Sequence, residues 1–125
     1  MPKVTTFLHR FQSNVNAWVL ACFGPVIAQD TRERNHRFLE ESLELVQACD
    51  CTREEAHKLV DYVFSRSRGD KEQETGGVLV TLAALCNAQR IDMADAGLIE
   101  LVRVWDKIDA IREKQARKQK DSCLP

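Results

Sequence analysis

Hydrophobic residues recur every three or four positions along most of the chain, which is the pattern of amphipathic helices. The first such segment covers about residues 4–21 and ends before Gly24-Pro25, because this pair disfavours continuation of a helix. Its apolar face consists of Phe7, Phe11, Val15, Trp18 and Cys22. We expect this segment to form the first helix.

Two further helices are marked by capping boxes, in which an acidic or hydroxyl residue is followed three positions later by a glutamate. Asp30 with Glu33 begins a second helix that continues to about Ala48. Thr52 with Glu55 begins a shorter third helix, which ends where the chain becomes rich in Arg, Ser and Gly.

A fourth helix is expected over about Lys71–Ala88, and a long last helix is expected after a cap formed by Asp92 and Asp95. The run at residues 76–81 resembles a buried strand when taken alone. The apolar stretch continues beyond this run, however, and no partner strand is present. The pattern therefore predicts an all-α fold with about five helices.

The length of 125 residues is that of one ordinary domain, so we expect a single domain over residues 1–125 with a flexible tail from about residue 117. The 18 basic and 19 acidic side chains give a formal net charge of -1, which provides no argument for binding nucleic acid or an anionic membrane. No signal peptide and no apolar run of about 20 residues is present. We expect a soluble protein of the cytoplasm.

The five cysteines include no Cys-x-x-Cys pair, which favours reduced thiols over a disulfide framework. Cys49 and Cys51 could hold zinc together with His36 or His57. The usual zinc-ligand spacing is absent, so zinc is the weaker interpretation.

Three carboxylates of the second expected helix share one stripe of its surface. With Glu40 as the origin of a helical wheel, Glu44 lies near about 40° and Glu41 near about 100°, and Glu33 and Arg37 lie on the same stripe. Neighbouring like charges repel, a cost that a bound divalent cation reverses. Magnesium suits carboxylates combined with water and phosphate oxygens, although for the stripe taken alone a solvated helix face is the simpler explanation.

Glu74 lies at the start of an otherwise apolar helix, next to the pair Gly76-Gly77. Each glycine costs up to about 1 kcal/mol of helix stability unless the backbone must approach another group closely. A metal and phosphate site would require such an approach, and so would a simple helix crossing.

The sequence Glu40-Glu41-Ser42-Leu43-Glu44, followed by Glu74, resembles the Glu-Glu-x-x-Glu and Glu-x-x-Asp signature of the all-α nucleoside triphosphate pyrophosphatases. This is the MazG-like superfamily, which includes the dimeric dUTPases. The stretches 30–41, 73–78 and 101–108 are similar to a small phage and bacterial branch, so the resemblance covers nearly the whole chain. It implies a four-helix core assembled as a homodimer or homotetramer.

The resemblance also implies an activity: Mg²⁺-dependent hydrolysis of a (deoxy)nucleoside triphosphate to the monophosphate and pyrophosphate, in which Mn²⁺ can replace Mg²⁺. Glu41, Glu44 and Glu74 match metal ligands of the family. Glu40 matches a second-metal ligand, and Glu40 and Glu41 are the candidates for activating water. A purine deoxynucleotide such as dGTP or dATP is implied by the phage-type branch alone.

The chain departs from the family signature at one position. The aspartate expected three residues after Glu74 is Gly77, which removes one metal ligand and leaves the metal count and catalysis open. Asp61 on the preceding helix is a candidate replacement.

Basic and aromatic residues complete the expected site. Arg37, Lys107 and Arg112 are the candidates for phosphate contact, with surface ion pairs as the alternative. Trp18 is the candidate for stacking on the base, with core packing as the alternative. We expect the remaining basic residues of the last helix to be solvated, namely Lys114, Arg117, Lys118 and Lys120.

Three other interpretations remain. The first is a nucleotide sensor or interaction module that has lost turnover through Gly77. The second is a carboxylate-bridged di-iron bundle, whose sites typically add Glu-x-x-His pairs, and Glu33 and Glu54 stand three positions before His36 and His57. The third is a plain helical scaffold, in which alanine replaces the glutamates without effect on metal or nucleotide binding.

Overall fold

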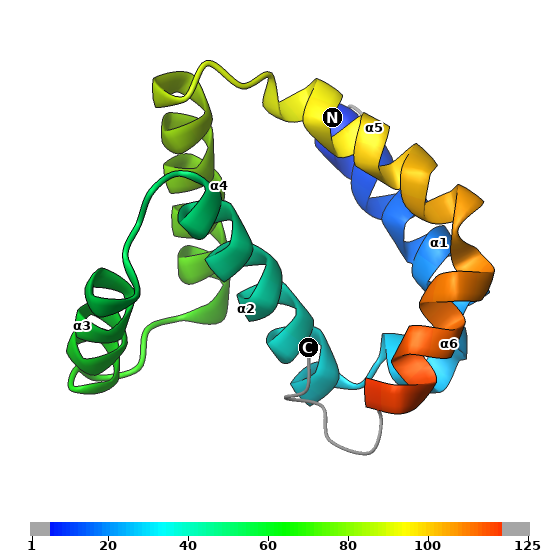
Figure 1. The fold of residues 1–125 in the computed structure, drawn as a ribbon, viewed down its shortest axis with the longest axis horizontal. Helices are drawn as coiled ribbons and strands as arrows, with labels where there is room; N and C mark the ends of the chain where they lie inside the picture. The colour runs from blue at the N-terminus through cyan, green and yellow to red at the C-terminus, as the bar shows by residue number, and fades with distance from the viewer. Residues whose placement is uncertain (1–5, 119–125) are drawn as a thin grey trace, which may run out of the picture. The chain divides into compact units, whose positions relative to one another are not determined.

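The computed structural model describes residues 6–118, and every secondary-structure element in this range is a helix (Figure 1). The all-α class is thus confirmed. None of the described helices is both long and apolar enough to cross a membrane. The helices are α1 (Phe7–Ala28), α2 (Thr31–Ala48), α3 (Arg53–Phe64), α4 (Lys71–Ala88), α5 (Met93–Asp106) and α6 (Ile108–Lys118).

Helix starts follow the predicted caps. The Thr52 hydroxyl accepts from the backbone N–H of Glu55 at 3.2 Å, and the Glu55 carboxylate accepts from the backbone N–H of Thr52 at 2.8 Å. Before α5, the Asp92 carboxylate accepts from the backbone N–H of Asp95 at 2.9 Å. These bonds satisfy N–H groups that have no partner within the helix.

The first helix is longer than predicted and is interrupted where its end was expected. Thr6 and His9 form a capping box before Phe7. At Gly24 the backbone leaves the helical region, with φ 78° and ψ 170°, and one further helical turn begins at Pro25. A positive φ is easily adopted by glycine, and proline fits the first turn of the new segment.

The predicted single last helix is two helices, so the expected count of five is wrong and six are present in residues 6–118. The break is a one-residue turn at Lys107, where the N–H bonds the carbonyl of Val104, three residues back, at 3.2 Å. No glycine or proline marks this point. Beyond the break, polar side chains of α6 contact α1 and α2, and the local sequence pattern does not reveal these contacts.

The chain divides into two compact units, the first containing the described residues up to Glu40 and from Gly97 onward. Within this unit α1 packs against α6, and α5 approaches α1 closely at Gly97. A Cβ atom at Gly97 would lie only 3.1 Å from the Phe11 ring, so the absence of a side chain permits this approach. Cys22 is buried here, with 3% of its surface exposed.

The second unit covers Glu41–Ala96 and contains the end of α2 together with α3 and α4. Cys86 is its buried apolar residue in the described chain, with 6% exposed. The apolar face of α3 is largely exposed, and 85% of Phe64 is accessible. Hydrophobic faces this open are typical of surfaces that another molecule covers.

Candidate functional site

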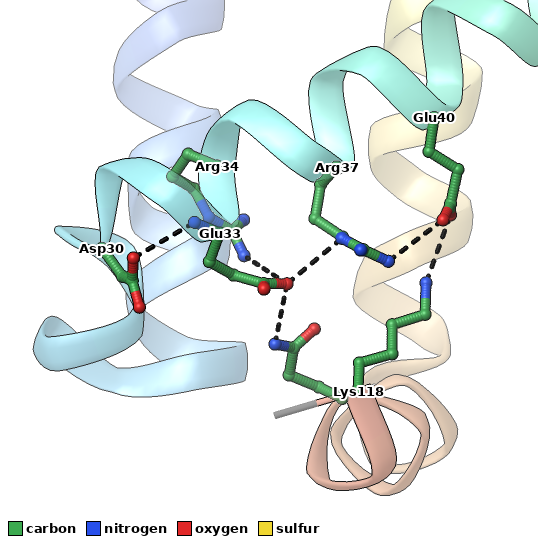
Figure 2. Close-up of polar contacts among 7 residues, drawn as sticks. Asp30, Glu33, Arg34, Arg37, Glu40 and Lys118 are labelled. Atoms are coloured by element: carbon green, nitrogen blue, oxygen red, sulfur yellow. Dashed lines mark hydrogen bonds and ion pairs between the residues drawn. The ribbon is translucent and has the colours of Figure 1, made fainter. Parts of the chain in front are cut away.

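The first half of α2 carries a charged cluster that joins it to α6 (Figure 2). The helix starts with the Asp30 carboxylate accepting from the N–H of Glu33 at 3.1 Å, which is the predicted cap, but the other half of the predicted capping box is absent because the Asp30 N–H bonds the carbonyl of Ile27. The Glu33 side chain is then buried, with 4% of the residue exposed. It accepts from Gln115 Nε2 at 3.0 Å and lies 3.1 Å from Arg37 Nε.

Glu40 ends this cluster. Its carboxylate pairs with Arg37 Nη1 at 3.0 Å and with Lys118 Nζ at 3.2 Å (Figure 2). The expectation that Lys118 is a solvated helix-end residue is wrong, because only 6% of Lys118 is exposed. Residues 117 and 118, where the predicted tail begins, belong to α6, and residues 119–125 lie outside the described part. Two cations already compensate the Glu40 carboxylate.

Glu41 and Glu44 lie beyond the cluster, on the part of α2 that belongs to the second unit. They are one helical turn apart and both are exposed. Across the described residues, Glu44 takes part in no ion pair, in contrast to Glu40. The Glu44 carboxylate is therefore accessible to water and to an added cation.

Glu74 and Asp61 belong to the same second unit and are also exposed. Glu74 is in the first turn of α4, and its side chain folds back over the preceding loop. A Cβ atom placed on Gly69 would lie 2.2 Å from Glu74 Oε1. Around Gly76 and Gly77, a Cβ atom would meet nothing within 4 Å. No part of the described chain therefore requires glycine at these two positions.

In residues 6–118, no three His, Cys, Asp or Glu side chains come together as a group that could hold a metal ion. The structure thus brings Glu41 and Glu44 onto one exposed helix surface without joining them to Glu74 and Asp61 in a ready-made centre. These carboxylates are hard oxygen donors of the kind that magnesium prefers, and magnesium completes its shell with water and phosphate oxygens. The donor chemistry fits magnesium, whereas zinc binds most often through cysteine and histidine.

Arg112 is occupied by a different partner from the expected phosphate. Its guanidinium Nε donates to the carbonyl of Cys22 at 2.9 Å, and its Nη2 donates to the carbonyl of Ala21. These carbonyls lie just before the break at Gly24, and Pro25, four residues after Ala21, has no N–H to donate. Arg112 therefore caps the end of the long segment of α1.

Lys107 and Trp18 both belong to the first unit. Lys107 is exposed at the turn between α5 and α6. Trp18 is half-buried and packs edge-on against Phe23, with 5.5 Å between ring centroids. Its indole N–H is buried and has no acceptor among the residues described. Contact of either side chain with a nucleotide stays a prediction.

Gln115 and Lys118 are the polar partners that the sequence did not reveal. They lie three positions apart on α6, the spacing of neighbours on one helix face. This spacing indicates a shared face, but no local signal identifies partners 82 and 78 residues away. Nearby, burial raises the pKa of Cys22, and the positive charges of Arg112 and Arg34 partly offset that rise.

Comparison of the chain with protein-family models, with curated proteins and with solved structures finds no match. The family resemblance therefore depends on the motif residues themselves.

Proposed function

We propose that this chain is a magnesium-dependent hydrolase that converts a (deoxy)nucleoside triphosphate, such as dGTP or dATP, to the monophosphate and pyrophosphate. The observation that carries the proposal is the pair Glu41 and Glu44, one turn apart and exposed on α2. The exposed carboxylates of Glu74 and Asp61 in the same unit supply further oxygen donors.

The proposed roles follow from the charges that the reaction must handle. Glu41, Glu44 and Glu74 would hold the cation, with Asp61 as the replacement for the aspartate missing at Gly77. Magnesium, when bound, supplies positive charge that neutralises the phosphate oxygens. A glutamate near the attacking water would accept its proton; Glu40 and Glu41 are the candidates, and for Glu40 this role would require release of the cations paired with it.

The ion pairs of Glu40 with Arg37 and Lys118 limit its ability to bind a metal ion. These pairs, at 3.0 and 3.2 Å, compete directly with a metal ion for the same carboxylate oxygens. A second metal at Glu40 would therefore require Lys118 to leave. We expect Lys118→Ala to tighten Mg²⁺ binding if Glu40 is a ligand and to leave it unchanged if Glu40 is purely structural.

The proposal includes assembly as a homodimer or homotetramer. A second copy would cover apolar side chains that are exposed on each unit, among them Val63, which is 57% exposed, and Phe64 on α3. Sedimentation at micromolar concentration should give a species larger than one chain. A monomer under these conditions would remove this part of the proposal.

The activity is tested by pyrophosphate release from each of the common ribo- and deoxyribonucleoside triphosphates with Mg²⁺ or Mn²⁺. Glu41→Ala and Glu44→Ala should each reduce release by at least about 100-fold, because each removes a metal ligand. Glu54→Ala is the matched control, since Glu54 is another exposed glutamate of the second unit, and it should leave release unchanged. Equal activity in all three variants would reject the proposed ligands.

The alternative function is a nucleotide sensor that binds without hydrolysis. It is favoured by Gly77 at the position of the expected aspartate and by the lack of a preassembled metal group within the described residues. A sensor would bind triphosphates in the presence of Mg²⁺ without releasing pyrophosphate. If Gly77→Asp then produced release, the missing ligand would be identified as the cause.

A further inference from the structure

An open groove of about 500 Å³ lies within the first unit, between one face of α1 and the start of α2. On the α1 side it is lined by four polar residues that share one face of the helix, His9, Gln12, Ser13 and Asn16, and by the apolar residues Val15, Val19 and Ala28. On the α2 side it is lined by Arg34. The volume is within the range of small-molecule pockets in proteins.

Arg34 is a partly buried cation whose hydrogen-bonding capacity residues 6–118 do not fill. Its Nε and Nη2 atoms are buried and have no hydrogen-bond partner in the described structure. The closest carboxylate oxygen, Glu33 Oε1, is 3.9 Å from Nη2, which is beyond hydrogen-bond distance. The guanidinium carbon lies 5.2 Å from the centre of the Phe23 ring, so one face of the group is stacked. What is missing is an acceptor at its edge.

The unfilled atoms define the ligand chemistry. Nε and Nη2 form one edge of the guanidinium, with two N–H groups that match the two oxygens of a carboxylate or phosphate. The neighbouring Arg37 shows the contrast, because Glu33 and Glu40 surround it at 3.1 and 3.0 Å. The protein thus supplies carboxylate partners for Arg37, whereas no described carboxylate lies within hydrogen-bond distance of Arg34.

The rest of the groove can bind the polar body of a small molecule. Nδ1 of His9 is held by Thr6 at 2.8 Å, which leaves Nε2 for another partner. In the part of the chain that the structure describes, Gln12, Ser13 and Asn16 make no side-chain hydrogen bonds and can therefore bond a ligand.

We propose that this groove binds a small polar molecule through a carboxylate or phosphate group held by Arg34. Arg34 is the one arginine or lysine among the described lining residues, so the groove fits a single oxyanion better than a triphosphate chain. The Nε and Nη2 atoms are buried in this structure, so an anion in the groove would bind this edge after a change of rotamer of Arg34, whose side chain is 29% exposed. None of these residues belongs to the carboxylate set of the proposed hydrolase, so either assignment can fail alone.

The test is an NMR titration of the arginine Nε–H signals of the full chain with sodium phosphate and, separately, with sodium acetate. Sodium chloride at equal ionic strength is the reference. We expect the Arg34 signal, assigned by its loss in Arg34→Lys, to shift in a saturable way with one oxyanion and not with chloride. A response to phosphate alone, or to acetate alone, identifies which group the natural ligand carries. No saturable shift with either oxyanion would overturn the proposal.

Two matched pairs of variants locate the site. Asn16→Asp places a negative charge in the groove and should weaken binding by about tenfold or more, whereas Asn14→Asp adds the same charge to exposed surface of α1 and should not. Arg34→Lys keeps the charge but lacks the two-pronged edge, and it should lose binding that Arg32→Lys retains. Equal affinities within either pair would show that the anion binds elsewhere and would also overturn the proposal.

Discussion

The glycine pair of α4 offers a test in which stability and function should change in opposite directions. A Cβ atom at Gly76 or Gly77 would meet nothing within 4 Å, and neither backbone has a positive φ. Alanine therefore introduces no clash and no strain in this chain. Since glycine in a helix interior costs about 0.8–1.0 kcal/mol relative to alanine, each substitution should stabilise the second unit by up to about that amount.

The measurement is urea unfolding followed by far-UV circular dichroism. Tryptophan fluorescence serves as an internal reference, because Trp18 and Trp105 both belong to the first unit and the gain should occur in the second. Gly69→Ala is the control, because it should not stabilise the second unit. Its added Cβ would lie 2.2 Å from Glu74 Oε1, so that carboxylate would have to move and no comparable gain is expected.

The functional half of the test uses the same variants. If the glycine pair leaves room for a metal-bound phosphate next to Glu74, the added methyl groups should reduce pyrophosphate release while the protein becomes more stable. Loss of stability in Gly76→Ala or Gly77→Ala would refute the reasoning, because it would mean that another group contacts these positions. Stabilisation with unchanged release would remove the proposed functional reason for the glycines.

Three further results are expected in the first unit. Glu33→Ala leaves buried cationic and amide groups without their acceptor, so it should lower the free energy of unfolding by about 3 kcal/mol. The exposed control Glu113→Ala should change this free energy by no more than about 0.5 kcal/mol. Equal effects of the two substitutions in urea unfolding would contradict the buried cluster. A hydrogen bond from Arg103 lowers the pKa of Glu100 below its ordinary value. This exposed pair should therefore contribute up to about 0.5 kcal/mol of stability above about pH 4.5. The contribution should be lost as the pH falls through the lowered pKa. In an NMR titration, Arg103→Gln should raise the Glu100 midpoint, and an unchanged midpoint would exclude the bond. Burial raises the pKa of Cys22, so peptide mapping should show alkylation of this thiol only on unfolding, and rapid labelling of the native chain would contradict its burial.

Helix boundaries proved predictable where local chemistry sets them. The capping box of Thr52 and Glu55, and the limits of α4 at Lys71 and Ala88, depend on side chains within a few positions of the helix end. Hydrophobic periodicity and helix caps are local signals, so a single amino-acid sequence contains all the information needed to predict them. The break at Lys107 has no such local signal. It is accompanied by contacts of α6 with residues far away in the sequence, such as the bond from Arg112 to Cys22.

The candidate site was predictable to the same extent. Helical spacing predicts that Glu40, Glu41 and Glu44 share one stripe of α2, and in the structure Glu41 and Glu44 are both exposed there. Spacing could not reveal that Glu40, immediately before them, is compensated by Lys118, 78 residues further along the chain. A long-range ion pair depends on how two helices meet, and no charge pattern within either helix specifies that geometry.

Separation of the reaction products tests the central claim most directly. The purified chain would be incubated with dGTP, dATP and the other common triphosphates in the presence of Mg²⁺, and the products would be resolved by anion-exchange chromatography. The proposed function predicts nucleoside monophosphate and pyrophosphate in equal amounts, with formation abolished by chelation of the metal and by Glu44→Ala. Formation of a diphosphate and inorganic phosphate, or no turnover of any triphosphate, would contradict it.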